Sequence, residues 1–141
     1  MSIAQEARVY EFLGQRKPRR ADLVALTRRG IPLKRVEHVM EAFQLDREGM
    51  THILGMSPRT YFRRLEKGDP LGAVESDRLV RFLRIAALAS EVFDDRANAV
   101  DWLKTENRAL GGVAPIEILD TDAGTSQVHE ILLRIQYGVY S

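Results

Sequence analysis

Cysteine is absent from this sequence of 141 residues, so disulfides and thiolate metal ligands are excluded. No stretch approaches the ~18 consecutive apolar residues that a membrane-spanning helix needs. The first residues, MSIAQEARVYEF, contain acids and no apolar core run, unlike a secretory signal. We therefore expect a cytoplasmic protein in a reducing compartment, without membrane contact.

Strand patterns are also missing, because no segment alternates apolar and polar residues with a period of two. Apolar residues instead recur at spacings of three and four, which is typical of amphipathic helices. The sequence therefore predicts an all-α fold. Helices are expected over residues 21–29, 32–44, 46–54, 57–67, 75–93, 96–105, 116–119 and 120–137.

Sets of residues that could perform catalysis are missing too. The histidines His38, His52 and His129 are scattered and lack the spacing of metal ligands. The paired glycines in ALGGVAP follow no predicted strand and precede no Lys-Ser or Lys-Thr, so they do not form a phosphate-binding loop. We therefore expect no catalytic residue, no metal and no cofactor. A small enzyme remains an alternative that no residue set supports.

The net charge of +1 hides an uneven distribution. Residues 1–68 contain 14 Lys and Arg against 8 Asp and Glu, whereas residues 69–141 contain 7 against 12. A basic half favours contact with nucleic acid, and a solvated bipolar surface is the alternative. The first 20 residues end in RKPRR, in which the proline disfavours a helix. We expect residues 1–20 to form a basic arm, either lying along phosphates or acting as a disordered linker.

The stretch 46–67 has the layout of a helix-turn-helix. Gly55 permits a tight turn, Ser57 is a good N-cap, and Pro58 suits the first position of the second helix. In this motif the second helix lies in the major groove of DNA. A helix pair with surface arginines that binds no DNA is the alternative. The predicted base contacts are Arg59, Thr60 and Arg63, and the predicted phosphate contacts are Arg64 and Lys67.

The helix expected over residues 75–93 is apolar on more than one stripe. One apolar stripe can pack against the rest of its own lobe. The second apolar stripe then needs another surface, which predicts a homodimer. A dimer would present two recognition helices to a palindromic operator. The residues concerned are Leu79, Phe82, Leu83, Ile85, Leu88 and Val92.

The C-terminal segment WLKTENRALGGVAPIEILDTDAGTSQVHEILLRIQYGVYS resembles the toxin-binding domain of Xre-type bacterial antitoxins, the partners of RES-domain toxins. The preceding LGMSPRTYFRRLEKG is similar to the helix-turn-helix of the same family, so the resemblance covers roughly residues 21–141. Arg64 departs from the general motif, because an apolar residue is common at its position. The matching residues are Trp102, Leu103, Asn107, Leu110, Gly111, Gly112, Pro115, Leu119, Thr121, Gly124, Ile135, Tyr137 and Gly138.

The resemblance implies a helix-turn-helix domain over residues 21–84 and a helical toxin-binding domain over 85–141. It implies an antitoxin that inactivates an NAD⁺-consuming RES toxin and represses its own operon by binding operator DNA. A stand-alone dimeric helix-turn-helix regulator is the alternative. The residues that we expect to bind toxin are Trp102, Asn107, Gly111, Gly112, Tyr137, Val139, Tyr140 and Ser141.

The last five residues, YGVYS, are unusually apolar for a chain end, which is usually polar and frays. A tyrosine ring gains free energy on burial but its hydroxyl still needs a partner. A nucleotide-binding cleft offers both apolar walls and polar groups. We therefore expect this tail to block the toxin's active site. The alternative is that Tyr137 and Tyr140 pack back on their own last helix.

Overall fold

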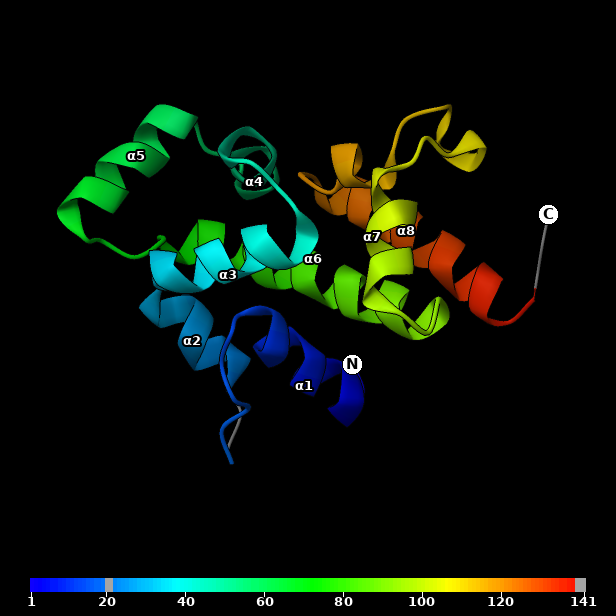
Figure 1. The fold of residues 1–141 in the computed structure, drawn as a ribbon, viewed down its shortest axis with the longest axis horizontal. Coiled ribbons are helices and arrows are strands. Elements are labelled where there is room, and N and C mark those ends of the chain that lie inside the picture. The colour runs from blue at the N-terminus through cyan, green and yellow to red at the C-terminus, as the bar shows by residue number, and fades with distance from the viewer. Residues whose placement is uncertain (20–21, 139–141) are drawn as a thin grey trace.

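The computed structural model describes residues 1–19 and 22–138, and this part of the chain contains helices and no strand (Figure 1). The prediction of an all-α fold is confirmed. In chain order the elements are α1 (Ile3–Phe12), α2 (Leu23–Arg29), α3 (Leu33–Phe43), α4 (Arg47–Leu54), α5 (Pro58–Lys67), α6 (Ala73–Val92), α7 (Arg96–Lys104), the 3₁₀ turns η1 (Arg108–Leu110) and η2 (Pro115–Ile118), and α8 (Asp122–Gln136).

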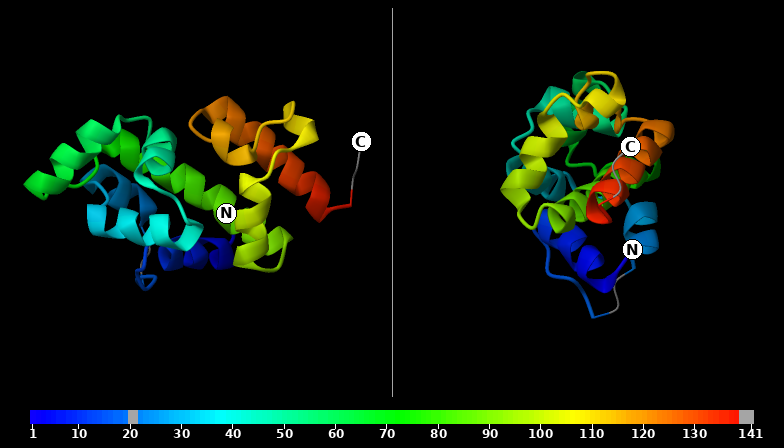
Figure 2. Two further views of the ribbon diagram at one scale, coloured as in Figure 1. Left: turned by 45° about the horizontal axis from the view of Figure 1, so that its top comes forward. Right: turned by 90° about the vertical axis from the view of Figure 1, so that its right-hand side faces the viewer.

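Helix α6 is the central element of the fold. Helices α1, α2, α4, α7 and α8 all pack against it, and the views in Figures 1 and 2 show them arranged around its length. Its residues Leu79, Phe82, Leu83, Ile85 and Leu88 are buried within the single chain. The surplus apolar stripe that predicted a homodimer is therefore covered by other helices of the same molecule. Dimerisation stays a prediction, but α6 no longer supports it.

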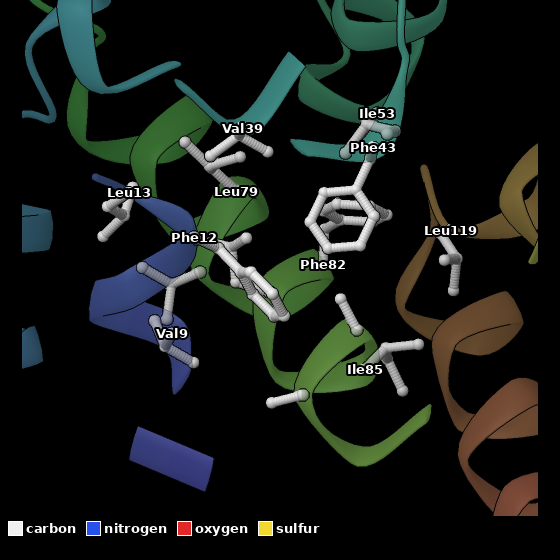
Figure 3. Packing of buried hydrophobic residues seen from close by; sticks show 14 of the residues in the cluster. Val9, Phe12, Leu13, Val39, Phe43, Ile53, Leu79, Phe82, Ile85 and Leu119 are labelled. Atoms are coloured by element: carbon white, nitrogen blue, oxygen red, sulfur yellow. The ribbon is translucent and has the colours of Figure 1, made fainter. Parts of the chain in front are cut away.

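Aromatic rings connect the N-terminal helices to α6. The Phe12 and Phe43 ring centroids lie 4.8 Å apart with the planes at 73°, and Phe43 and Phe82 lie 5.3 Å apart at 77°. Both pairs are edge-to-face, an arrangement that stabilises aromatic pairs beyond their buried area. Figure 3 shows these rings among the surrounding aliphatic side chains, with Ile85 and Leu119 on the side of the C-terminal helices. One core therefore runs through the whole molecule.

The N-terminal residues differ from the expected arm. Residues Ile3–Phe12 form α1, which starts with a capping box between Ser2 and Gln5. Val9, Phe12 and Leu13 are buried against the core, so the prediction of an arm is wrong for this stretch. The reason is that these apolar residues, spaced for a helix, bury more surface than an extended arm would. After α1 the basic stretch turns back, and Lys17 pairs with Glu6 at 3.4 Å.

The two expected domains share α6. The boundary predicted between residues 84 and 85 falls inside this continuous helix. The N-terminal end of α6 contacts the helix-turn-helix, and its C-terminal end contacts α7 and α8 (Figure 1). No helix among the described residues is both long and apolar enough to cross a membrane.

Candidate functional site

The turn between α4 and α5 has the geometry that the sequence predicts. Asp46 caps α4 by accepting from Gly49 N at 2.8 Å, and Ser57 caps α5 by accepting from Thr60 N at 3.1 Å. Gly55 ends α4 with φ +67°, in the left-handed region that favours glycine. These local signals therefore place α5 directly after a short turn, as a helix-turn-helix requires.

A residue of helix α6 forms a hydrogen bond with the end of α4, next to this turn. The Arg78 guanidinium donates to the Leu54 carbonyl at 3.0 Å and so satisfies one of the free carbonyls at the end of α4. A Cβ on Gly55 would lie 2.4 Å from Arg78 Nη1. Glycine at this position thus serves two purposes, the backbone conformation and the close approach of Arg78. The angle between α4 and α5 is stabilised by a residue outside the motif.

The outer face of α5 carries most of the predicted DNA contacts. Tyr61 is buried beneath the helix, while Arg59, Arg63 and Lys67 are exposed. Arg59 and Arg63 are four residues apart and therefore share one face. Thr60 is half-buried, and its hydroxyl accepts from Ser57 Oγ at 2.9 Å and lies 3.4 Å from Arg63 Nη2. Its hydroxyl is thus already engaged in the cap.

Arg64 does not lie on this face. Its Nη1 is 2.6 Å from Glu75 Oε1 on the first turn of α6, and both side chains are mostly covered. This ion pair explains why an arginine stands where helix-turn-helix motifs usually carry an apolar residue. A long arginine side chain can be partly covered along its aliphatic stem while its guanidinium reaches a neighbouring helix. We therefore exclude Arg64 from the DNA contacts proposed below.

Two residues outside the predicted DNA contacts also lie at the helix-turn-helix surface. Phe62 on α5 is 46% exposed, and Arg47 at the start of α4 lies over its ring. The spacing of Phe62 from Arg59 was a usable signal, because residues three apart in a helix share a face.

In the C-terminal half, the predicted toxin-binding residues of the loop after α7 form one compact turn. The Asn107 side chain accepts from Ala109 N at 3.0 Å, and its backbone exchanges bonds with Val113 and Gly112 at 3.0 Å each. Gly111 and Gly112 have φ of +75° and +93°. A Cβ on either glycine would meet no atom within 4 Å. The glycines thus give an exposed turn with bare backbone on its outside.

Trp102 has a different environment. It is half-buried, and its ring lies 5.5 Å from that of Phe93 at the end of α6. It therefore supports the α6–α7 corner with one face while part of its surface remains accessible.

The start of α8 is locked onto η2. Thr121 caps α8 by accepting from Gly124 N at 2.9 Å. A Cβ on Gly124 would lie 1.9 Å from the Ile118 carbonyl oxygen, so only glycine fits there. From this fixed start α8 runs outward to Tyr137, which is 72% exposed. Figure 2 shows this end of α8 projecting from the body of the molecule. The predicted contacts Val139, Tyr140 and Ser141 lie outside the described residues.

The helix-turn-helix and the C-terminal lobe touch at His52 on α4. Its Nε2 lies 2.8 Å from the Glu117 carbonyl oxygen and 3.7 Å from Asp120 Oδ1. From α6, Arg81 Nη2 donates to the Asp120 carbonyl at 3.0 Å. The loop that follows η2 is therefore held by both the first helix of the motif and the central helix.

These features define a helix-turn-helix DNA-binding protein with an additional C-terminal helical lobe. The family model of the antitoxin Xre-like helix-turn-helix domain matches residues 22–84, and that of the antitoxin Xre/MbcA/ParS C-terminal toxin-binding domain matches residues 88–138. The chain belongs to the Xre family of antitoxins. It thus combines a DNA-binding domain with a domain that binds a toxin.

Individual relatives agree with this assignment. Antitoxin Xre of Photorhabdus laumondii subsp. laumondii is 32% identical over 120 residues, which are 84% of this chain and 81% of the relative. Antitoxin Xre of Pseudomonas putida is 41% identical over 80 residues, 57% of this chain and 50% of the relative. The protein named Prs ADP-ribosylating antitoxin from Sphingobium sp. is 25% identical and covers 94% of this chain and 87% of its own length.

Proposed function

We propose that this antitoxin inhibits a RES-domain toxin that consumes NAD⁺, by placing its C-terminal segment in or over the toxin's active site. The observation that carries the proposal is the position of Tyr137, 72% exposed at the outer end of α8. An aromatic side chain left in water at the tip of a projecting helix favours burial in a partner. The toxin's identity and its use of NAD⁺ come from the family resemblance of residues 102–141.

Other exposed backbone supports a toxin-facing surface around this helix. The turn at Gly111 and Gly112 presents backbone without side chains, so a partner can approach it closely. Val113 beside it is 37% exposed. We propose that this turn and Trp102 bind the outside of the toxin while the segment after α8 reaches its cleft.

The packing-back alternative also has a place in the structure. A groove of about 540 Å³ lies between α1, α6 and α8, and Leu88, Leu133 and Tyr137 are among the residues that line it. A terminal segment that folded back would bury apolar surface there. The exposure of Tyr137 disfavours this alternative for Tyr137 itself. The test must therefore separate loss of inhibition from loss of stability.

The experiment is deletion of residues 138–141 in the full chain, co-expressed with the protein encoded by the neighbouring reading frame. We expect the truncated antitoxin to keep its thermal stability and to co-purify with the toxin, while NAD⁺ falls and growth stops. Val74→Ala is the matched control, because Val74 is an exposed apolar residue on α6, remote from α8. Full neutralisation by the truncated chain would overturn the active-site block. A drop in melting temperature of the free protein would favour packing into the groove.

We further propose that the antitoxin represses its own operon through α5. The exposed Arg59, Arg63 and Lys67 on one side of this helix support the proposal. A reporter driven by the DNA upstream of the coding sequence should be repressed by the intact chain and released by Arg59→Ala. Repression without any co-purifying toxin would instead favour a stand-alone regulator.

A further inference from the structure

Phe62 is an exposed aromatic residue beside the exposed arginines of α5. Nearly half of its side chain, 46%, is accessible. It lies three residues after Arg59, so these two side chains are neighbours on α5, and Arg59 is in turn a neighbour of the exposed Arg63 four residues on. An exposed phenyl ring beside arginines gains nothing from water, which indicates a partner that offers apolar groups beside negative charge.

A second residue lies over this ring. Arg47, the first residue of α4, places its guanidinium carbon 5.7 Å from the centroid of the Phe62 ring. A cation over an aromatic face is attracted by the ring quadrupole. The contact joins the two helices of the motif at their outer surface. Among the described residues the Arg47 guanidinium has neither a hydrogen bond nor an ion pair, so its donors are available to a ligand.

We propose that Phe62 is a specificity-determining residue that reads thymine methyl groups in the major groove, and that Arg47 binds an adjacent phosphate. This inference rests on the DNA-binding half of the proposed function. A phenyl ring cannot form the hydrogen bonds that read other bases. The thymine 5-methyl is an apolar group that the major groove presents, and Phe is one of the side chains that contact it. The neighbouring Arg59 and Arg63 are suited to guanine, so the half-site should contain thymine beside guanine.

The arrangement also explains the pairing of Phe62 with Arg47. A guanidinium over the face of a ring keeps N–H donors that can meet phosphate oxygens. Insertion of the ring beside a methyl group would thus bring the cation to the backbone in the same movement. A phosphate contact positions the protein but carries no sequence information. The two residues therefore have distinct and separable roles.

The test measures fluorescence anisotropy of the full chain on a duplex taken from the DNA upstream of its coding sequence. A second duplex carries deoxyuridine in place of every thymidine, which removes the methyl groups and keeps every base pair. We expect the intact protein to bind the uracil duplex roughly three- to tenfold more weakly, as loss of one or two buried methyl contacts implies. The Phe62→Ala variant should have the same affinity for the thymine and uracil duplexes, so its thymine-to-uracil ratio should fall to about one. Phe62→Leu, which keeps an apolar side chain, should retain part of the difference.

Two controls separate the roles. Val24→Ala removes an exposed apolar residue from α2, which is 59% exposed, and should keep the full thymine-to-uracil ratio. Arg47→Ala should weaken both duplexes alike and lower the salt dependence by about one phosphate contact, since each neutralised phosphate releases counterions.

The outcomes distinguish this inference from the function on which it rests. If the intact protein binds the upstream duplex no better than a scrambled one, the autorepressor proposal fails, and the reading of thymine fails with it. If the upstream duplex is bound specifically but Phe62→Ala keeps the same thymine-to-uracil ratio as the intact chain, only the present inference is overturned. A change in sedimentation mass of Phe62→Ala with an unchanged ratio would also overturn it, because the ring would then contact a second protein chain.

Discussion

The Arg64 guanidinium of α5 and the Glu75 carboxylate of α6 form an ion pair with 2.6 Å between Nη1 and Oε1. The same carboxylate oxygen accepts from Gly72 N at 3.2 Å, so Glu75 also caps its own helix. The pair joins the C-terminal half of α5 to the first turn of the central helix α6. It therefore adds stability to the packing of α5 on α6, and Arg64 itself faces away from the surface proposed to bind DNA.

We expect Arg64→Ala to reduce stability without changing how DNA is held. Removing a partly covered, charge-assisted pair should cost about 1 kcal/mol of unfolding free energy. The salt dependence of DNA binding should stay the same, because no phosphate contact is lost. Urea unfolding and salt titrations of DNA binding measure the two effects. A reduced salt slope with unchanged stability would place Arg64 on a phosphate instead.

Arg59→Ala and Arg63→Ala should weaken binding to the operator more than binding to scrambled DNA. Loss of a bidentate base contact costs about 1–3 kcal/mol. Lys67→Ala should instead weaken both equally and flatten the salt slope, as expected of a phosphate contact. Competition binding on the two duplexes separates these patterns. If neither arginine variant alters the specificity ratio, a different helix reads the DNA.

Gly124→Ala should unfold or loosen the C-terminal lobe. The added Cβ would lie 1.9 Å from the Ile118 carbonyl oxygen, which is backbone and cannot rotate away. Overpacking of this kind costs about 1–3 kcal/mol. Gly111→Asn is the matched variant, because nothing surrounds that position and asparagine tolerates a positive φ. Thermal melting should separate them. Equal melting temperatures would show that η2 and α8 can move apart.

Stability should fall at alkaline pH because of Tyr61. Burial, followed by the charge of Glu37, raises the pKa of Tyr61 above its ordinary value. As the pH rises past about 10, the unfolded chain loses this proton before the folded chain does, so the free energy of unfolding decreases. The Tyr61 hydroxyl has no hydrogen-bond partner among the described residues. Tyr61→Phe should therefore be neutral or stabilising near neutral pH.

The same substitution should reduce the alkaline loss of stability. It should not abolish the loss, because burial also raises the pKa of Tyr10. Urea midpoints at neutral pH and at about pH 10.5 provide the measurement, with Tyr10→Phe as the matched control. An alkaline loss as large in Tyr61→Phe as in the intact chain would contradict this origin.

The helices and the turn at Gly55 were predictable from the sequence, because their signals act over a few residues. The side chains of Asp46 and Ser57 accept from backbone N–H groups three residues ahead, and Gly55 adopts the left-handed conformation that ends α4. Because each of these effects is local, the residue types suffice to place the turn. The same holds for the outward direction of Arg59 and Arg63, which follows from helical spacing. The class of protein was accessible from the motif residues of the C-terminal half.

Contacts between segments far apart in the chain were decided only by the tertiary structure. The two apolar stripes of α6 are indistinguishable in the sequence. Only the packing shows that α1, α7 and α8 bury the stripe that was expected to form a dimer interface. Arg64 reads as one more surface cation until Glu75 is seen beside it. The capping box of Ser2 with Gln5 and the burial of Val9 turned an expected arm into a core helix. The spacing of residues along a helix determines which of them share a face. What that face packs against depends on the free energy of burial, which sums contributions from partners along the whole chain.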